Sequence, residues 1–159
     1  MASKKPKKTT APGTILNRRA RFDYALGEEL TVGIALTGQE TRAARDGHLQ
    51  LKGSFVSHKG GELWLNNASF SLKLNERGNP GTRSIDTRAR KLLAKRKEID
   101  ALAAKKQSGM SIVPIRLNTS GRYIKLVIAL GKGKKEYDKR ETIKRRQQDR
   151  DAKRAVANY

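Results

Sequence analysis

Between positions 21 and 37, apolar residues alternate with other residues along the chain. They occupy even positions: Phe22, Tyr24, Leu26, Leu30, Val32, Ile34 and Leu36. A period of two predicts an extended strand with one buried face. Gly27 and Gly33 lie within this segment, and glycine inside a strand is typical of a bulge or bend. We therefore predict one long, curved strand.

A short helix is predicted directly after this strand. Glu40 follows Thr37 by three residues, which is the spacing of a capping box at a helix start. Arg42 and Arg45 are three residues apart and therefore share a helix face. Gly47 is the residue type that ends a helix in the left-handed conformation. The helix should span about two turns.

Residues 49–70 are predicted to form a β-hairpin. Leu49, Leu51 and Phe55 alternate with polar residues, and a second strand-forming run covers 62–70. The turn between them is Lys59-Gly60-Gly61. Segment 75–82, which holds two glycines and an Asn-Pro pair, is predicted to be a loop.

The longest predicted helix covers residues 84–106. Its apolar residues recur at helical spacing and indicate one buried stripe: Ile85, Ala89, Leu92, Leu93, Ile99, Leu102 and Ala103. Its other faces carry cations: Arg88, Arg90, Lys91, Lys95, Arg96 and Lys97. These could be an ordinary solvated face, but charge of a single sign favours contact with phosphate.

Two further strands are predicted at 110–117 and 123–130, joined by a turn at 118–121. Val113, Ile115 and Leu117 should share one face of the first, and the even positions from Ile124 to Leu130 one face of the second. Pro114 lacks an amide hydrogen and therefore indicates an edge position or a missing ladder bond. The predicted fold is mainly β with two inserted helices, a small antiparallel barrel like the oligonucleotide-binding fold, over residues 14–131.

Both ends of the chain are predicted to be basic tails. Residues 1–13 hold little to bury, which favours a disordered arm. Residues 132–159 hold few apolar side chains, although Asp138 and Glu141 have the spacing of a helix cap. We expect this second tail to be disordered alone and to fold as a helix on a partner.

The charge of the chain narrows the choice of partner. There are 36 Lys and Arg residues against 15 Asp and Glu, a formal net charge of +21. A polyanion is the expected partner, because each phosphate neutralised by Lys or Arg releases a counterion. The sequence has no apolar run near the ~20 residues of a membrane span. Nucleic acid is therefore favoured over a membrane.

Candidate catalytic chemistry is sparse. The chain has no cysteine, and His48 and His58 both lie beside glycine-containing turns, where solvated side chains are expected. Metalloprotease, hydrolase-elbow and P-loop motifs are missing from the sequence. We expect no catalytic residue, no metal and no cofactor.

The aromatic residues favour recognition of a folded RNA. They make up 5% of the chain, and Phe22, Phe55, Trp64 and Phe70 fall in predicted strands, where core positions are expected. Extensive base stacking is therefore not expected from the barrel. Tyr137 differs, because it lies between Lys135 and Lys139, a combination that can hold an unpaired base and its backbone together.

Several strings resemble one family. They are Asn17-Arg18-Arg19-Ala20-Arg21, the segment from Gly33 to Arg42, Ser54-Phe55-Val56, Arg90-Lys91-Leu92-Leu93, and the block from Ala129 to Arg145 that contains Gly-Lys-Gly-Lys-Lys and Tyr-Asp-Lys-Arg. In this order they resemble the small protein B (SmpB) family, the tmRNA-binding proteins of bacterial trans-translation. The resemblance runs from about Ile15 to the end of the tail.

The resemblance implies a cytoplasmic, ribosome-associated RNA adaptor that is not an enzyme. It implies a monomeric barrel that binds the tRNA-like domain of tmRNA and enters the empty A site of a stalled ribosome, contacting elongation factor Tu only through tmRNA. The tail would enter the vacant mRNA channel as a helix, beside the small-subunit rRNA of the decoding site. Tag translation would then release the ribosome and mark the peptide for degradation.

The site residues divide between these two RNAs. On the tmRNA side we expect Asn17, Arg19, Arg21, Glu40, Arg42, Arg45, Arg90, Lys91, Leu93, Lys95 and Lys125. On the decoding-site and mRNA-channel side we expect Lys132, Lys134, Lys135, Tyr137, Asp138, Lys139, Arg140, Ile143, Lys144 and Arg145, with Tyr137 stacking near the decoding bases.

The chain departs from the family pattern at four places, of which Arg42, in place of a usual lysine, keeps the charge. Ala43 replaces a usual serine, Thr31 replaces a usual glutamate whose role could pass to Glu28 or Glu29, and the loop at 75–82 differs. Three other readings remain open from sequence: a ribosomal or assembly protein, an RNA-modifying enzyme, and a basic protein without specificity.

Overall fold

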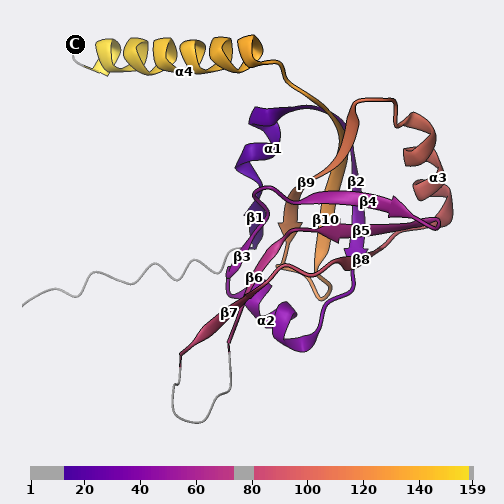
Figure 1. Ribbon diagram of the computed structural model, residues 1–159. Helices are drawn as coiled ribbons and strands as arrows, with labels where there is room; N and C mark the ends of the chain where they lie inside the picture. The colour runs from indigo at the N-terminus through magenta and orange to yellow at the C-terminus, as the bar shows by residue number, and fades with distance from the viewer. Residues whose placement is uncertain (1–12, 74–80, 158–159) are drawn as a thin grey trace, which may run out of the picture.

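The computed structural model describes residues 13–73 and 81–157 (Figure 1). The strands are β1 Thr14–Leu16, β2 Tyr24–Ile34, β3 Leu49–Gln50, β4 Phe55–Lys59, β5 Glu62–Asn66, β6 Ser69–Lys73, β7 Arg83–Asp86, β8 Arg90–Leu93, β9 Met110–Asn118 and β10 Lys125–Gly133. The helices are α1 Arg18–Asp23, α2 Gly38–Arg45, α3 Arg96–Lys105 and α4 Glu136–Ala157.

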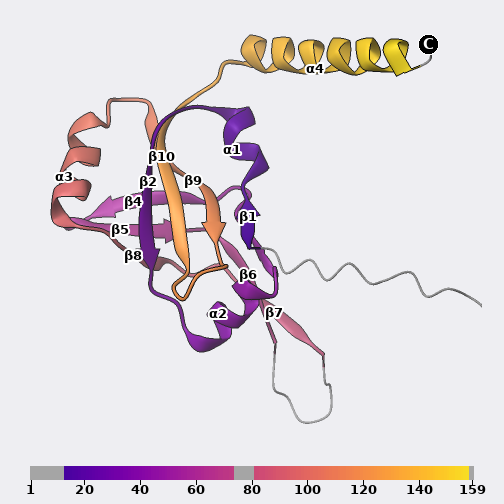
Figure 2. The same ribbon diagram turned by 180° about the vertical axis from the view of Figure 1, so that it is seen from behind.

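Six of these strands close an antiparallel barrel in the order β9-β10-β2-β8-β5-β4. The barrel closes where Val56 of β4 pairs with Ile112 of β9, and β1 adds to the far end of β9. A second, small sheet of β3, β6 and β7 extends from one end of the barrel. Strands β2 and β10 pair with each other and lie side by side in the view of Figure 2. The predicted mainly β barrel is confirmed.

The long strand after residue 21 is confirmed from Tyr24 onward as β2. Glu29 pairs with Ala129 and Leu26 with Gly131, so two residues of β2 lie opposite one of β10, and Gly27 is in the predicted bulge. Gly33 is in regular pairing instead; a Cβ there would lie 3.1 Å from the Cβ of Leu93. Helix α1 was missed, because the alternation at Phe22 resembles the start of the strand.

The helix predicted at 84–106 is wrong over its first half. Residues 83–86 and 90–93 form β7 and β8, and only Arg96–Lys105 are helical. In β8, Arg90 and Leu92 are buried while Lys91 and Leu93 face outward, which is a period of two. Strand β8 fills the gap between β2 and β5, so closing the barrel outweighs the local helical spacing.

The predicted hairpin is present as β4 and β5. Gly60 and Gly61 form its two-residue turn with φ of 58° and 75°, values that glycine tolerates best. Gly53, with φ of 75°, interrupts the alternation of faces, so that Val56 rather than Phe55 faces the core. Phe55 is 49% exposed, and its expected core position is wrong. Asn67, with φ of 60°, divides the return strand into β5 and β6.

The two strands predicted after residue 110 are confirmed as β9 and β10, with one change of face. Val127 pairs with Arg116 and Ile128 with Pro114, so Ile115 is an extra residue in a bulge beside the proline. Leu117 therefore faces the main core with Ile112, whereas Ile115 packs with Val127 and Ala129 outside it. The predicted single face for 113, 115 and 117 is wrong.

The C-terminal region is helical, which differs from the predicted disorder of the tail. Helix α4 begins at Glu136 rather than Asp138, and the Asp138 carboxylate accepts from the backbone N–H of Lys135 at 3.3 Å. An ion pair of 2.6 Å between Arg140 and Glu136 also supports its first turns, although α4 has no buried residue. The last barrel strand continues to Gly133, two residues beyond the predicted boundary.

The N-terminal arm, predicted to be disordered, and most of the loop predicted at 75–82 lie outside the described residues.

Candidate RNA-binding surfaces

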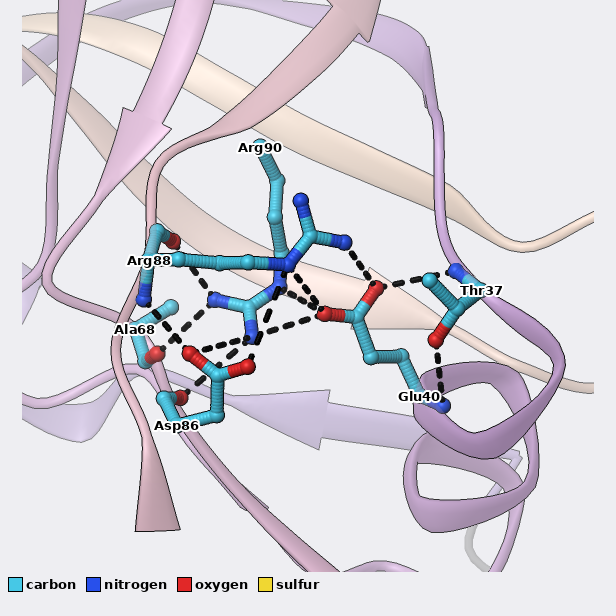
Figure 3. A network of polar contacts seen from close by, with 6 residues as sticks. All are labelled: Thr37, Glu40, Ala68, Asp86, Arg88 and Arg90. Carbon is cyan, nitrogen blue, oxygen red and sulfur yellow. Dashed lines mark hydrogen bonds and ion pairs between the residues drawn. The ribbon is translucent and has the colours of Figure 1, made fainter.

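The carboxylate of Glu40 lies at the centre of a buried polar network (Figure 3). Thr37 caps α2 by accepting from the Glu40 N–H, and Glu40 accepts in return from the Thr37 N–H at 2.9 Å. Both Glu40 oxygens also accept from arginines: Nε of Arg90 at 3.0 Å, and Nε and Nη2 of Arg88 at 2.9 and 2.8 Å. One side chain thus joins α2 to the segment that carries β8.

Arg90 is fully buried, and its surroundings compensate its charge. Its guanidinium donates to the carbonyls of Ala68 and Arg88 and stacks over the Phe70 ring at 3.8 Å. Burial lowers the pKa of Arg90 from its ordinary value, while the Glu40 carboxylate acts in the opposite direction. Arg90 and Glu40 therefore do not reach a bound RNA directly. They hold β8 and α2 in position.

Five of the residues expected to face tmRNA lie together at the α2 end of the barrel. We name this group the Lys125 surface; it consists of Arg45, Lys91, Leu93, Lys95 and Lys125, which line two adjoining recesses of about 360 and 710 Å³. Leu93 is 55% exposed between these cations. The surface combines an apolar contact with several cations.

Arg45 organises the edge of this surface. Its guanidinium donates to the carbonyls of Thr119, Gly121 and Arg122 at 3.0, 3.1 and 3.0 Å, which fixes the turn between β9 and β10. That turn presents Tyr123, 68% exposed, with the Arg122 guanidinium over its ring at 5.4 Å. Sequence reasoning assigned Tyr123 to the following strand and missed it. The Arg-Tyr pair after Gly121 was the available signal.

The other expected tmRNA contacts lie elsewhere. Asn17 is buried, and Arg19 and Arg21 belong to α1 at the opposite end of β2. From Tyr24 to Gly33 the strand covers about 30 Å, so α1 is distant from the Lys125 surface. Arg42 lines a separate recess with Lys73 and Arg83. The structure therefore does not gather the predicted residues on a single face.

Helix α1 contacts the start of the tail. The Lys134 N–H donates to the Asp23 carbonyl at 2.8 Å, and its Nζ donates to the Arg21 carbonyl at 3.1 Å. Lys139 forms an ion pair with Asp23 at 3.2 Å. Phe22, expected in the core, is only half-buried, with Lys139 and Arg146 each 6.0 Å from its ring centre. This contact sets the direction in which α4 leaves the barrel.

The remaining tail residues are available to a partner. Tyr137 and Ile143 are 59% and 55% exposed, and Lys132, Lys135, Arg140, Lys144 and Arg145 are exposed as well. His48 and His58 are both exposed. Over the described ranges, no group of three or more His, Asp or Glu is placed to hold a metal ion. Within those same ranges, no helix is long and apolar enough to cross a bilayer.

Known proteins share this fold and these strings. A solved structure described as "tmRNA-SmpB: a journey to the center of the bacterial ribosome" contains a similar chain, with a TM-score of 0.60 and 35% identity over 78% of this chain and 86% of that one. The SsrA-binding proteins of Streptococcus pyogenes M49 and Streptococcus mutans are 44% and 43% identical to it, each over 90% of this chain and 91% of the relative. A family model described as "SmpB protein" matches residues 14–158. The chain belongs to the SmpB family.

Proposed function

We propose that this protein is the tmRNA-binding adaptor of trans-translation. It binds the tRNA-like domain of tmRNA, also called SsrA RNA, and brings it to the A site of a stalled ribosome. The names of its relatives and the ribosomal setting of the similar solved structure support this function. The protein acts as a monomer in the cytoplasm, performs no catalysis itself and meets elongation factor Tu only through tmRNA.

The observation that carries the proposal is the separation of two cationic regions on one molecule. The Lys125 surface lies at the α2 end of the barrel, and the tail begins beside α1 at the other end, about 30 Å away along β2. One molecule can therefore contact two RNAs at once. The barrel binds tmRNA, and the tail binds the ribosome.

On the tmRNA side, the Lys125 surface makes the direct contacts. Lys91, Lys95, Lys125 and Arg45 supply positive charge to the phosphates, and Leu93 packs against an exposed sugar or base. Glu40 and Arg90 support this surface from inside. Asn17, Arg19, Arg21 and Arg42 lie outside this surface.

On the ribosome side, α4 lies in the empty mRNA channel and Tyr137 stacks near the decoding bases. Its cations can face the rRNA on several sides of the helix, because no residue of α4 is buried and its described contacts with α1 run through Lys139 and Arg146. Within α4 they are Lys139, Arg140, Lys144 and Arg145, while Lys134 and Lys135 precede the helix and Lys132 lies at the end of β10. Asp138 stabilises the first turn, and Ile143 supplies one apolar contact.

The test compares the tRNA-like domain of tmRNA with ordinary tRNA in a binding titration over a series of salt concentrations. Specific recognition predicts that the tmRNA fragment binds more tightly at every salt concentration. Lys125→Gln should weaken this binding and lower the salt slope by roughly one, with Lys52→Gln as an exposed control outside the surface. Equal affinities for both RNAs at all salt concentrations would contradict the proposal and favour a non-specific basic protein.

A further inference from the structure

A further recess, of about 450 Å³, lies between α1, β4 and the start of β9, away from the Lys125 surface. We name it the Phe55 recess; its lining includes Asn17, Arg19, Tyr24, Phe55, His58 and Lys106. We propose that it binds one unpaired nucleotide of ribosomal RNA. The inference rests on the proposed function, because it names a second contact of the same adaptor with the ribosome.

Phe55 supplies the first argument. Phe55 is 49% exposed although its neighbour Val56 is buried and closes the barrel against Ile112. A half-exposed phenyl ring at the wall of a recess is a platform on which a nucleobase can stack, since every base has a π face. The strand phase directs this ring outward, so packing of the core does not account for phenylalanine at this position.

Asn17 supplies an independent argument from its position in the lining. Its side chain is held from one end only, because Nδ2 donates to the Pro114 carbonyl at 2.8 Å while Oδ1 has no partner. Oδ1 is the only buried side-chain nitrogen or oxygen in the described residues that lacks a hydrogen bond. Asn17 is 6% exposed and Oδ1 itself is buried, so a donor such as the amino group of a base reaches this acceptor only when the lining opens slightly as the base enters.

The charges around the recess favour a nucleotide over a neutral ligand. Arg19 and Lys106 are exposed at its rim, and His58 is exposed beside them. The single carboxylate in the lining, Asp23, is already paired with Arg19 at 3.3 Å and Lys139 at 3.2 Å. Lys106 can therefore bind a phosphate at the rim, whereas Arg19 already shares its charge with Asp23.

The place of the recess identifies which RNA supplies the nucleotide. It adjoins α1, which also holds the start of the tail through Lys134 and Lys139. The Lys125 surface lies about 30 Å away along β2, so a tRNA-like domain bound there leaves the recess open. The ribosomal RNA that binds the tail therefore also lies next to the recess.

The experiment measures two affinities for each variant of the full chain: for the tRNA-like domain alone, and, as the complex with tmRNA, for ribosomes with an empty A site. We expect Phe55→Leu to bind the tRNA-like domain normally but ribosomes roughly tenfold more weakly, because the stacking ring is lost. Phe55→Tyr should restore ribosome binding. Ile85→Ala, which removes an exposed apolar side chain from the second sheet, should change neither affinity.

Three results would overturn the proposal. They are normal ribosome binding by Phe55→Leu, equal weakening by Phe55→Leu and Phe55→Tyr, and equal weakening of both RNA affinities by Phe55→Leu. A thermal melt of each variant identifies misfolding, and NMR of the free chain then supplies a second measurement. The Asn17 side-chain amide signals should shift when a single-stranded hexanucleotide is added and not when a duplex is added. Signals that stay unchanged with the single strand, or that shift only with the duplex, would also overturn the proposal. Failure of the wild type to distinguish tmRNA from tRNA would instead reject the proposed function.

Discussion

Glu40 is a buried carboxylate that accepts from two guanidinium groups and from the start of its own helix. Such a group is stabilising only while its partners remain. Its removal leaves the buried charge of Arg90 with the more distant carboxylate of Asp86, at 3.7 Å, and a buried charge that loses its nearest partner is strongly destabilising.

Glu40→Gln should therefore lower the free energy of unfolding by about 3–5 kcal/mol, measured by urea denaturation. The matched control is Glu62→Gln, which removes the partner of Lys91 from a pair that is 42% and 44% exposed. That change should cost less than ~1 kcal/mol, because water screens the pair. Similar losses in both variants would show that the network does not support the barrel.

At the residue scale, local chemistry was predictable and distant partners were not. Thr37 and Glu40 are three residues apart, so their capping box could be read from sequence and is present. Glu40 and Arg90 are 50 residues apart, and only the closing of the barrel brings them together. Sequence reasoning therefore expected Arg90 among the tmRNA contacts, with no signal that it is buried.

At the scale of elements, turns defined by glycine were predictable, whereas the face of a strand after a bulge was not. The pair Gly60-Gly61 marked a hairpin, and both residues have positive φ. The extra residue at Ile115 has no comparable mark beyond Pro114, yet it reverses the face of every residue on one side of it. The helix predicted at 84–106 failed similarly, because helical spacing over a few residues also fits two short strands.

A pair of glycine substitutions tests the hairpin turn. Gly61→Ala forces alanine to adopt φ of 75° and places its Cβ close to the Arg96 guanidinium, so unfolding should become easier by roughly 1–2 kcal/mol. Gly38→Ala is the control: it lies in the first turn of α2, has no atom within 4 Å of a new Cβ and should be neutral or stabilising. Chemical denaturation of both variants measures the difference in their free energies of unfolding. Equal stabilities would mean that the positive φ at Gly61 does not contribute to stability.

At the scale of the whole molecule, the tail is attached to the barrel without being part of its core. The residues of α4 are not buried, and its start is held by Asp23 and Arg21 of α1. The sequence indicated the separate character of the tail through its few apolar residues. It did not indicate contact with α1, because α1 itself was not predicted.

Truncation after Lys135 should separate the two RNA contacts. It removes α4 and keeps all of β10, along with the hydrogen bond from Lys134 to the Asp23 carbonyl. We expect binding to the tRNA-like domain within about twofold of the full chain, and loss of peptide tagging on stalled ribosomes in a reconstituted translation assay. Loss of both activities in a truncated protein that still melts cooperatively would mean that the barrel and the tail form a single RNA-binding surface.

The attachment of α4 near its N-terminal end has a geometric consequence. At 1.5 Å per residue its 22 residues extend about 33 Å, and the helix can rotate about the short segment between Gly133 and Glu136. A rotation of about ten degrees there would displace the C-terminal end of α4 by about 6 Å. Small changes in the contacts beside Asp23 would therefore redirect the far end of the helix.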